Sequence, residues 1–530
     1  MAPLPDYTTL SLEEQIAQMM IVRASGHLFD RQIRFPQWEL SSKRLQKLIS
    51  DLKVGGVILL GGSAAEIAQR TTQLQEWAAF PLLIAADIEE GVGQRFAGGT
   101  WFPPPMALGD IARTNLALAK QYAETMGKAT AQEALALGIN WVLAPVVDVN
   151  NNPNNPVINV RSFAAISETV CELASAFIAG AQTYPVLTTA KHFPGHGDTS
   201  TDSHLNLPVL ALTEERLKEV ELPPFIRAIA QGVDAVMSAH LRVSPWDDTL
   251  PATLSSTVLT QQLRLNLGFE GLIVTDALIM GALSEIAPPE EIAILAIEAG
   301  ADILLMPDHP ESAIAAIAEA VNNGRLSPQR ISASVARIGQ AKAKIGLEDT
   351  ANFQTQLATP QAIETSQQIL TASLRTKGDL PLSPPETPCQ NLIIVDDLLN
   401  CDFLDRSSSA IALPQQLGYD LQFLGQAQVF PQPPQNSPLT LVQLFTRGNP
   451  FRGESGLNQE TTAYLQALFD QGCVQAVIIY GSPYILTWLE TQLPATVPWV
   501  FSYGQTKDSC AIALQKVFET PAESTSQPFL

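Results

Sequence analysis

The chain has 530 residues, of which 46% are hydrophobic and 16% are charged, and its formal net charge is −22. This length and apolar content favour a large buried core and two domains, one of them large. The acidity argues against a nucleic-acid groove or an anionic membrane surface as partner, because both need clustered Lys and Arg.

The N-terminal segment does not resemble a secretion signal. Pro3 and Pro5 stand at its start, and Glu13 and Glu14 interrupt the apolar residues that follow. No later stretch offers the roughly twenty uninterrupted apolar residues that a membrane-spanning helix needs. The five cysteines lie far apart, without the close pairs of zinc or redox sites. We therefore expect a soluble protein in the reducing environment of the cytoplasm, and the sequence does not indicate its oligomeric state.

From about residue 10 to 345, short apolar runs alternate with longer amphipathic segments, as in repeated βα units around a parallel sheet. The expected strands are 19–22, 55–60, 82–86, 140–144, 187–190, 235–238, 272–275 and 302–306. The expected helices include 41–52, 64–77, 115–137, 168–183, 213–230 and 290–299. Eight strands, each followed by a helix, predict an α/β fold with a (β/α)₈ TIM-type barrel in residues 1–350.

Polar residues follow most of these strands directly. They are Asp87, Asp148, Lys191, His192, His240, Asp276 and Asp308. In a barrel of this kind the residues after each strand meet at the C-terminal face, whatever their separation in sequence. The sequence thus predicts one common site at that face.

The composition changes at about residue 351. Residues 351–390 are rich in Thr, Gln, Pro and Ser, and we interpret them as a linker with one helix at 360–374. Residues 391–530 contain three apolar runs typical of buried strands, at 391–395, 474–480 and 499–503, and two helical patterns, at 459–471 and 508–518. They predict a smaller C-terminal α/β layer domain, with an exposed loop at 430–438.

The segment from Lys191 to His204 has the character of a long active-site loop. Three of the six histidines fall within these fourteen residues, and Gly195 and Gly197 permit backbone angles that other residues avoid. A metal site is the natural rival for such a cluster. The histidine next to Lys191 and the one between two glycines lack the local spacing of zinc ligands, so we expect no metal and no cofactor.

Proton transfer and nucleophilic attack both have a candidate group. A carboxylate at Asp202 can orient the imidazole of His204, which can then donate and accept a proton near neutral pH. Asp276 ends a buried apolar strand, a costly position unless the carboxylate is hydrogen-bonded or functional. Each also has a simpler explanation: Asp202-Ser-His204 as an incidental loop, and Asp276 as the N-cap of a helix.

The run Lys191-His-Phe-Pro-Gly-His-Gly, followed after four residues by Asp-Ser-His204, resembles the signature of the β-N-acetylglucosaminidases of glycoside hydrolase family 3. Residues 271–278 resemble the nucleophile strand of that family, and weaker matches extend the resemblance over about residues 10–345. The resemblance implies a hydrolase that acts on a small carbohydrate, with muropeptides in cell-wall recycling as a candidate substrate.

Carried over by position, the resemblance makes Asp276 the nucleophile, His204 the general acid/base and Asp202 its orienting partner. It implies that sugar hydroxyls are bound by four further residues, Asp87, Arg161, Lys191 and His192. His196 and His240 would shape the pocket and its loop.

The implied mechanism is retaining, with a covalent glycosyl intermediate on Asp276. A neutral histidine does not repel an anionic acceptor, so a phosphorylase that forms GlcNAc-1-phosphate is an alternative to a hydrolase. A family 3 β-glucosidase shares the barrel and the nucleophile strand, but that branch generally lacks the Gly-His-Gly to Asp-Ser-His loop. Substrate-assisted hexosaminidases typically place a carboxylate beside the nucleophile position, where this chain has Thr275 and Ala277. A carbohydrate-binding protein without turnover is the most distant alternative.

One residue departs from the family pattern. The segment that begins at Asp87 has Val92 where related chains have an arginine. Arg95 could take over that contact with the sugar, or the preferred leaving group could differ.

Overall fold

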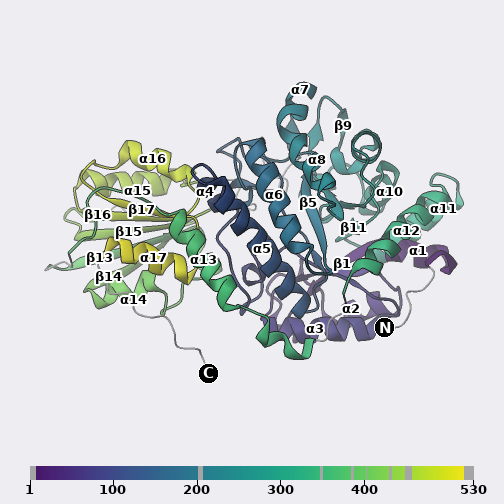
Figure 1. Cartoon of the computed structure of the whole chain (residues 1–530), viewed down its shortest axis with the longest axis horizontal. Coiled ribbons are helices and arrows are strands. Elements are labelled where there is room, and N and C mark those ends of the chain that lie inside the picture. The colour runs from purple at the N-terminus through teal and green to yellow at the C-terminus, as the bar shows by residue number, and fades with distance from the viewer. Residues whose placement is uncertain are drawn as a thin grey trace. The chain divides into compact units, whose positions relative to one another are not determined.

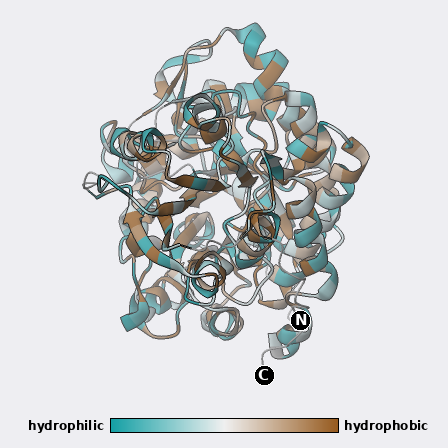
Figure 2. Ribbon diagram, turned by 90° about the vertical axis from the view of Figure 1, so that its left-hand side faces the viewer, coloured by the Kyte–Doolittle hydropathy of each residue, from teal (hydrophilic) through white to brown (hydrophobic). Residues whose placement is uncertain are grey.

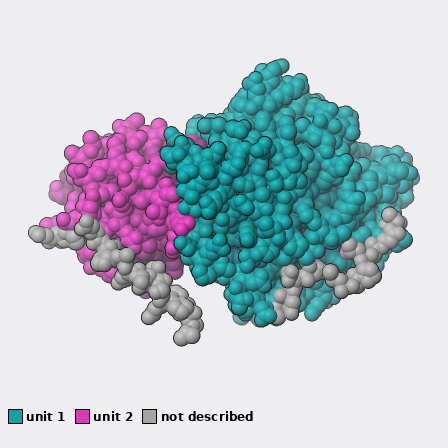
Figure 3. Space-filling view, in the orientation of Figure 1, with its two compact units in different colours: residues 1–365 teal, residues 366–530 magenta. Residues whose placement is uncertain are grey.

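The computed structural model describes residues 7–200, 207–346, 350–383, 387–401, 403–428, 433–447 and 456–518. The chain divides into two compact units, Met1–Thr365 and Ser366–Leu530 (Figure 3). Within the described ranges, no helix is both long and apolar enough to cross a membrane.

The first unit is built on an eight-stranded sheet whose strands are all paired in parallel, in the order β10-β7-β5-β4-β3-β2-β1-β11. The strands are β1 (Met20–Ser25), β2 (Gly56–Leu60), β3 (Leu83–Ala86), β4 (Trp141–Val142), β5 (Leu187–Phe193), β7 (Ala235–Ser238), β10 (Leu272–Thr275) and β11 (Leu304–Leu305). A bridge between Val274 and Ile303 joins the two edge strands. The sheet therefore closes into the barrel that the sequence predicts.

Helices surround this sheet (Figure 1). They are α1 (Leu12–Gln18), α2 (Ser42–Ser50), α3 (Ala64–Trp77), α4 (Met106–Ala112), α5 (Leu116–Ala136), α6 (Ser167–Ala181), α7 (Glu214–Arg216), α8 (Leu222–Ala230), α9 (Gly281–Ser284), α10 (Pro289–Ala299), α11 (Pro310–Asn322) and α12 (Pro328–Lys344). Barrel strands such as β2 and β3 are apolar and almost wholly buried, whereas helices such as α3 have both buried and exposed residues. Figure 2 shows that helices of the molecule carry both hydrophilic and hydrophobic residues. The barrel is thus held by apolar contacts between the strands and one face of each helix.

Local sequence signals set several helix starts. Ser63 accepts a hydrogen bond from the backbone N–H of Glu66, whose carboxylate accepts one from the N–H of Ser63, and this capping box starts α3. Elsewhere the sequence predicts one continuous helix over 213–230, and the structure has an unbroken helix from Glu214 to Ala230 whose hydrogen-bond pattern changes along its length. Between α7 and α8 stands the π-helical segment η5 (Leu217–Glu221). A second π-helical segment, η7, spans Thr257–Asn266, and β6 (Val209–Leu210), β8 (Arg242–Val243) and β9 (Asp247–Pro251) form a small separate sheet.

The second unit contains a six-stranded sheet in the order β12-β17-β16-β15-β13-β14, parallel except for β12. The strands are β12 (Arg375–Lys377), β13 (Cys389–Val395), β14 (Tyr419–Gly425), β15 (Leu439–Thr446), β16 (Val474–Gly481) and β17 (Trp499–Ser502). The helices are α13 (Pro360–Ala372), which begins in the first unit, α14 (Ser409–Gln416), α15 (Gln459–Asp470), α16 (Tyr484–Gln492) and α17 (Lys507–Val517). An α/β layer domain is therefore confirmed, although its sheet has three strands more than the sequence indicates.

Candidate active site

The barrel directs three of the predicted site residues to the same side of its wall. Lys191 and Val274 are both register partners of Met237, so they share one face of the sheet, and Asp276 lies two residues beyond Val274. Ala85 is aligned with Trp141, and Trp141 with Leu187, which lies four residues before Lys191. Asp87, two residues beyond Ala85, consequently projects from the face that carries Lys191 and Asp276.

Lys191 is at the centre of a buried ion cluster. Its ammonium Nζ lies 2.7 Å from Asp87 Oδ1 and 2.6 Å from Glu89 Oε1. Arg161 donates from Nε and Nη2 to the two oxygens of Glu89, at 2.9 and 2.8 Å, and from Nη1 to the carbonyl of Val157. Two carboxylates and two cations balance in charge, which a buried ion cluster requires.

Mutual pairing keeps this cluster ionised. Burial opposes the charged form of Glu89, but Arg161 and Lys191 outweigh it and hold the pKa of the Glu89 carboxyl well below its usual range. Burial likewise opposes the charged form of Lys191, and Asp87 and Glu89 raise its pKa above the ordinary value. Glu89 and Lys191 consequently carry fixed charges at neutral pH.

Glu89 is a functional candidate that the sequence analysis missed. It is buried and binds both cations of the cluster, so it fixes the orientation of two predicted sugar ligands. Its only signal in the sequence is its place two residues after Asp87, on the loop that leaves β3.

His192 belongs to a second buried network, centred on Asp148. Its Nδ1 lies 2.8 Å from Asp148 Oδ2, which leaves Nε2 as the nitrogen for a ligand. Asp148 Oδ1 also accepts the backbone N–H of His196 at 2.7 Å. Burial opposes ionisation of Asp148, but His192 and His196 outweigh it and lower its pKa. Burial lowers the pKa of His196 to about 4, so this ring is neutral at physiological pH.

The beginning of the predicted active-site loop is in fact strand. β5 continues through Lys191 and His192 to Phe193, all of them buried, because their polar groups are satisfied by the two networks above. The loop proper starts at Pro194. A Cβ added to Gly197 would lie 1.8 Å from the carbonyl oxygen of Val149, so glycine is required there by close backbone approach.

Asp276 stands half-buried at the end of β10. Its Oδ1 accepts the backbone N–H of Ala277 at 2.8 Å. His240 lies beside this turn, with Nε2 3.0 Å from the carbonyl of Ala277 and Nδ1 2.7 Å from Thr253 Oγ1. His240 is fully buried and both of its ring nitrogens are engaged, so its position suits support of the Asp276 turn better than contact with a sugar.

The departure from the family pattern has a packing explanation. Val92 is fully buried and lies against Gly99, where an added Cβ would be 2.6 Å from Val92 Cγ1. Arg95 is exposed, and its Nε donates to the backbone carbonyl of Asp87 at 3.0 Å. Arg95 therefore supports the loop that carries Asp87.

Asp202 and His204 lie outside the described residues. Among the residues that are described, no group of three or more His, Cys, Asp or Glu side chains is arranged to hold a metal ion.

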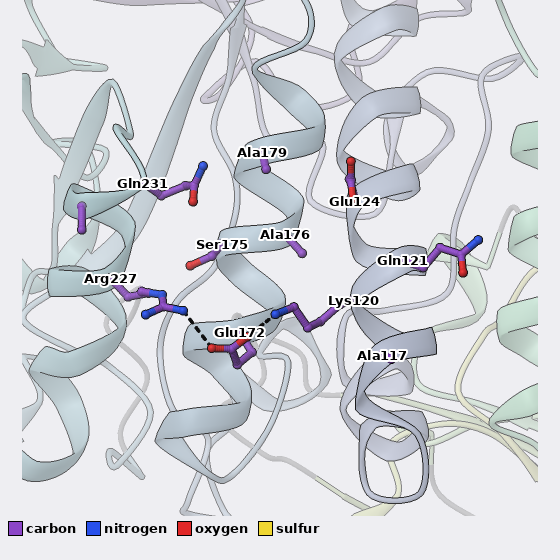
Figure 4. Close-up of a pocket in the computed structure, with 11 residues that line it drawn as sticks. Ala117, Lys120, Gln121, Glu124, Glu172, Ser175, Ala176, Ala179, Arg227 and Gln231 are labelled. Carbon is purple, nitrogen blue, oxygen red and sulfur yellow. Dashed lines mark hydrogen bonds and ion pairs between the residues drawn. The ribbon is translucent and has the colours of Figure 1, made fainter.

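A groove of about 760 Å³ on the outer side of the barrel is not a candidate for the active site. It lies on α5, α6 and α8, among small side chains and the ion pairs of Glu172 with Lys120 and Arg227 (Figure 4). These cations already have a carboxylate partner, and the groove is lined by residues of the outer helices rather than by residues that follow the strands, where barrel chemistry occurs.

Comparison with known proteins identifies relatives of both units. Residues 11–341 match the glycosyl hydrolase family 3 N-terminal domain, and residues 383–519 match the bacterial glycosyl hydrolase family 3 C-terminal domain. The chain is 36% identical over 332 residues to a beta-hexosaminidase A of Pseudoalteromonas piscicida, covering 57% of this chain and 55% of that protein. It is 32% identical over 372 residues to a beta-N-acetylglucosaminidase/beta-glucosidase of Cellulomonas fimi, covering 67% of this chain and 64% of that one. The chain thus spans somewhat over half the length of these two relatives.

Solved structures show the same architecture over nearly the whole chain. A glycoside hydrolase family 3 beta-N-acetylglucosaminidase from Paenibacillus sp. str. FPU-7 matches with a TM-score of 0.78 and 30% identity, covering 96% of this chain and 98% of that one. A beta-glucoside phosphorylase matches with a TM-score of 0.83 at 22% identity, covering 97% and 94%, and this second likeness concerns the fold alone.

Proposed function

Since the chain belongs to glycosyl hydrolase family 3, we propose that it is a retaining exo-β-N-acetylglucosaminidase that releases terminal, non-reducing GlcNAc from β-linked glycosides. The observation that carries the proposal is the projection of Asp276 from the same face of the barrel as the Asp87, Lys191 and Glu89 ion cluster. A carboxylate beside an array of fixed donors and acceptors suits attack on a sugar held by its hydroxyls.

The ion cluster supplies the contacts for those hydroxyls. Within the described part of the chain, Lys191 uses two of its three donors on carboxylates, and Asp87 uses one of its two oxygens. The remaining Lys191 N–H and the remaining Asp87 oxygen form a donor and acceptor pair, which a vicinal diol can bind. Arg161 adds further donors, oriented by Glu89, and the side chain of His192, held by Asp148, adds Nε2 as a further polar contact.

The proposed reaction has two displacement steps. The ionised Asp276 attacks the anomeric carbon, while protonated His204 gives its proton to the departing glycosidic oxygen. Neutral His204 then takes a proton from water, the water oxygen attacks the same carbon, and Asp276 leaves as a carboxylate. Asp202 would hold the imidazole by accepting a hydrogen bond from one ring nitrogen.

Muropeptide fragments in cell-wall recycling are the proposed natural substrate, and the cytoplasm is the proposed location. The support is the resemblance of the Lys191 to His204 segment and the state of the five cysteines, all of which are free. Secreted proteins more often pair their cysteines in disulfides.

Two alternative activities share this site. A β-glucosidase would need no acetamido contact, and a phosphorylase would use phosphate in the second step. Chromogenic β-GlcNAc and β-glucoside substrates with the same leaving group separate the first alternative, and faster turnover of the glucoside would contradict our assignment. Formation of GlcNAc-1-phosphate on addition of phosphate would identify a phosphorylase.

A further inference from the structure

The helical segment that follows the predicted active-site loop contacts the beginning of that loop, just after Pro194. It runs as α7, η5 and α8, and Pro223 and Pro224 stand in the first turn of α8, just after η5. Neither proline has an N–H to donate to the preceding turn, so the regular helical pattern is interrupted here. A π-helical turn is rare and occurs frequently at functional sites. Glu221 is its last residue.

Glu221 is packed against the loop although it carries a carboxyl group. Its side chain is fully buried, and a Cβ added to Gly195 would lie 3.0 Å from both the Cβ and the Oε2 of Glu221. Among the described residues Oε2 has no hydrogen-bond partner, and Oε1 lies 3.4 Å from Asn151 Nδ2. A buried carboxyl with so few partners is costly unless it has a role.

Arg216 links Glu221 to a second point of the same loop. Its Nη2 lies 3.6 Å from Glu221 Oε1 and 3.5 Å from Asp198 Oδ2, between the two carboxyl groups. Gly195 and Asp198, which this helical segment contacts, belong to the first part of the loop, residues 194–200, which we call the first limb. Asp202 and His204 follow four and six residues after Asp198.

Among the described residues, the charged groups that act on Glu221 are Arg216 from α7, Asp198 from the loop and Asp148 from the segment after β4. Burial raises the pKa of Glu221 to about 7, Asp148 and Asp198 add to the rise, and Arg216 and the amide of Asn151 oppose it. When neutral, Glu221 leaves Arg216 to Asp198. When ionised, it competes for Arg216 and repels both aspartates.

We propose that Glu221 is a positioning residue, which through Gly195 and Arg216 sets the first limb of the loop that carries the proton-transfer pair Asp202 and His204. When Glu221 is neutral, Arg216 stays paired with Asp198 and holds the first limb in place. When Glu221 is ionised, it competes with Asp198 for Arg216, and the first limb becomes more mobile. The inference rests on the proposed function, because it assigns proton transfer to His204.

The leaving-group dependence of Glu221→Ala tests this role. A 2,4-dinitrophenyl leaving group departs without a proton, whereas a methyl glycoside needs the general acid. We expect kcat/KM for the methyl β-GlcNAc glycoside to fall at least about tenfold more than that for the dinitrophenyl glycoside. Glu172→Ala, on the outer face of the barrel, is the matched control and should change neither rate. Equal losses on both substrates in Glu221→Ala would show a merely structural role and overturn the proposal.

The pH profile of Glu221→Gln gives a second test, because glutamine keeps the shape of the neutral acid and cannot ionise. We expect the alkaline limb of kcat/KM to move to higher pH by about half a unit or more, and its slope to lose the contribution of one proton. Superimposable profiles of Glu221→Gln and the wild-type chain would contradict the proposal.

Amide hydrogen exchange separates this inference from the proposed function, since it needs no turnover. We expect residues 194–200 of the full wild-type chain to lose protection as the pH rises through about 7, and those of Glu221→Gln to keep it. Arg216→Gln should lack this protection at every pH. The same pH dependence in wild-type and Glu221→Gln chains would refute the role of Glu221, whereas a wild-type chain that fails to hydrolyse β-GlcNAc substrates would refute only the function.

Discussion

Replacing Glu89 by glutamine tests the importance of the buried ion cluster. The change preserves the shape of the side chain, but it removes the charge that pairs with Lys191 at 2.6 Å and with Arg161 at 2.8 and 2.9 Å. Glu89 is 4% exposed and Lys191 2%, so water cannot replace the lost partner. Removing one partner of a buried pair typically costs about 3–5 kcal/mol. We expect the low end of that range, because Lys191 keeps Asp87.

Glu172→Gln is the matched control, because Glu172 also pairs with one lysine and one arginine. Those partners, Lys120 and Arg227, are 43% and 53% exposed. Exposed pairs contribute about 0–1 kcal/mol. Urea unfolding of the full chain, monitored by the tryptophan fluorescence of the barrel, gives the change in the free energy of unfolding for Glu89→Gln and for Glu172→Gln. Equal losses in Glu89→Gln and Glu172→Gln would refute the claim that the cluster is a buried, mutually dependent unit.

Three further outcomes follow from the same geometry. Gly197→Ala places a Cβ where the carbonyl oxygen of Val149 lies, so we expect at least about a tenfold loss of kcat/KM. Gly324→Ala, which is strained only by its backbone φ of +82° and lies outside the site, should leave catalysis unchanged. Burial lowers the pKa of Lys342 from 10.5 to about 7, so between these pH values the unfolded chain binds one proton more than the folded chain. The free energy of unfolding of the wild-type chain should therefore rise with pH from about 7 to 10.5. Urea unfolding of Lys342→Met should show no such rise. Arg95→Gln should reduce kcat/KM for a β-GlcNAc glycoside much less than Arg161→Gln does. A larger loss in Arg95→Gln would indicate that Arg95 contacts the sugar.

The barrel was predictable because its strands are short apolar runs whose spacing repeats along the chain. The rule that residues after each strand share one face also predicts that Asp87, Lys191 and Asp276 meet, although they are far apart in the sequence. Strand ends were less predictable. β5 extends through Lys191 and His192, and such polar residues are not expected in a buried strand. They are buried because they pair with Glu89 and Asp148, which are distant in the sequence and so give no local signal.

Three strands of the second unit escaped prediction for related reasons. β12 and β14 are edge strands with polar, partly exposed residues, so they lack a continuous apolar signal. β15 is central, but its buried Gln443 interrupts the apolar run, and this amide is satisfied by Asn391 Oδ1 and the carbonyl of Ala410. Contacts between distant residues of this kind cannot be inferred from local composition.

Glu221 illustrates the same limit within the site. In the sequence it is one acidic residue in a helical pattern, with nothing to separate it from Glu214 or Glu219. Its burial and the close approach of Gly195 become evident only in the structure.

The identity of the nucleophile is the most direct test of the whole account. A 5-fluoro derivative of a β-GlcNAc substrate slows breakdown of the covalent intermediate, so the labelled enzyme can be digested and its peptides analysed by mass spectrometry. We expect the sugar to be attached to Asp276, and no label to form in Asp276→Ala. A label on another carboxylate, or labelling that persists in Asp276→Ala, would contradict the proposed mechanism.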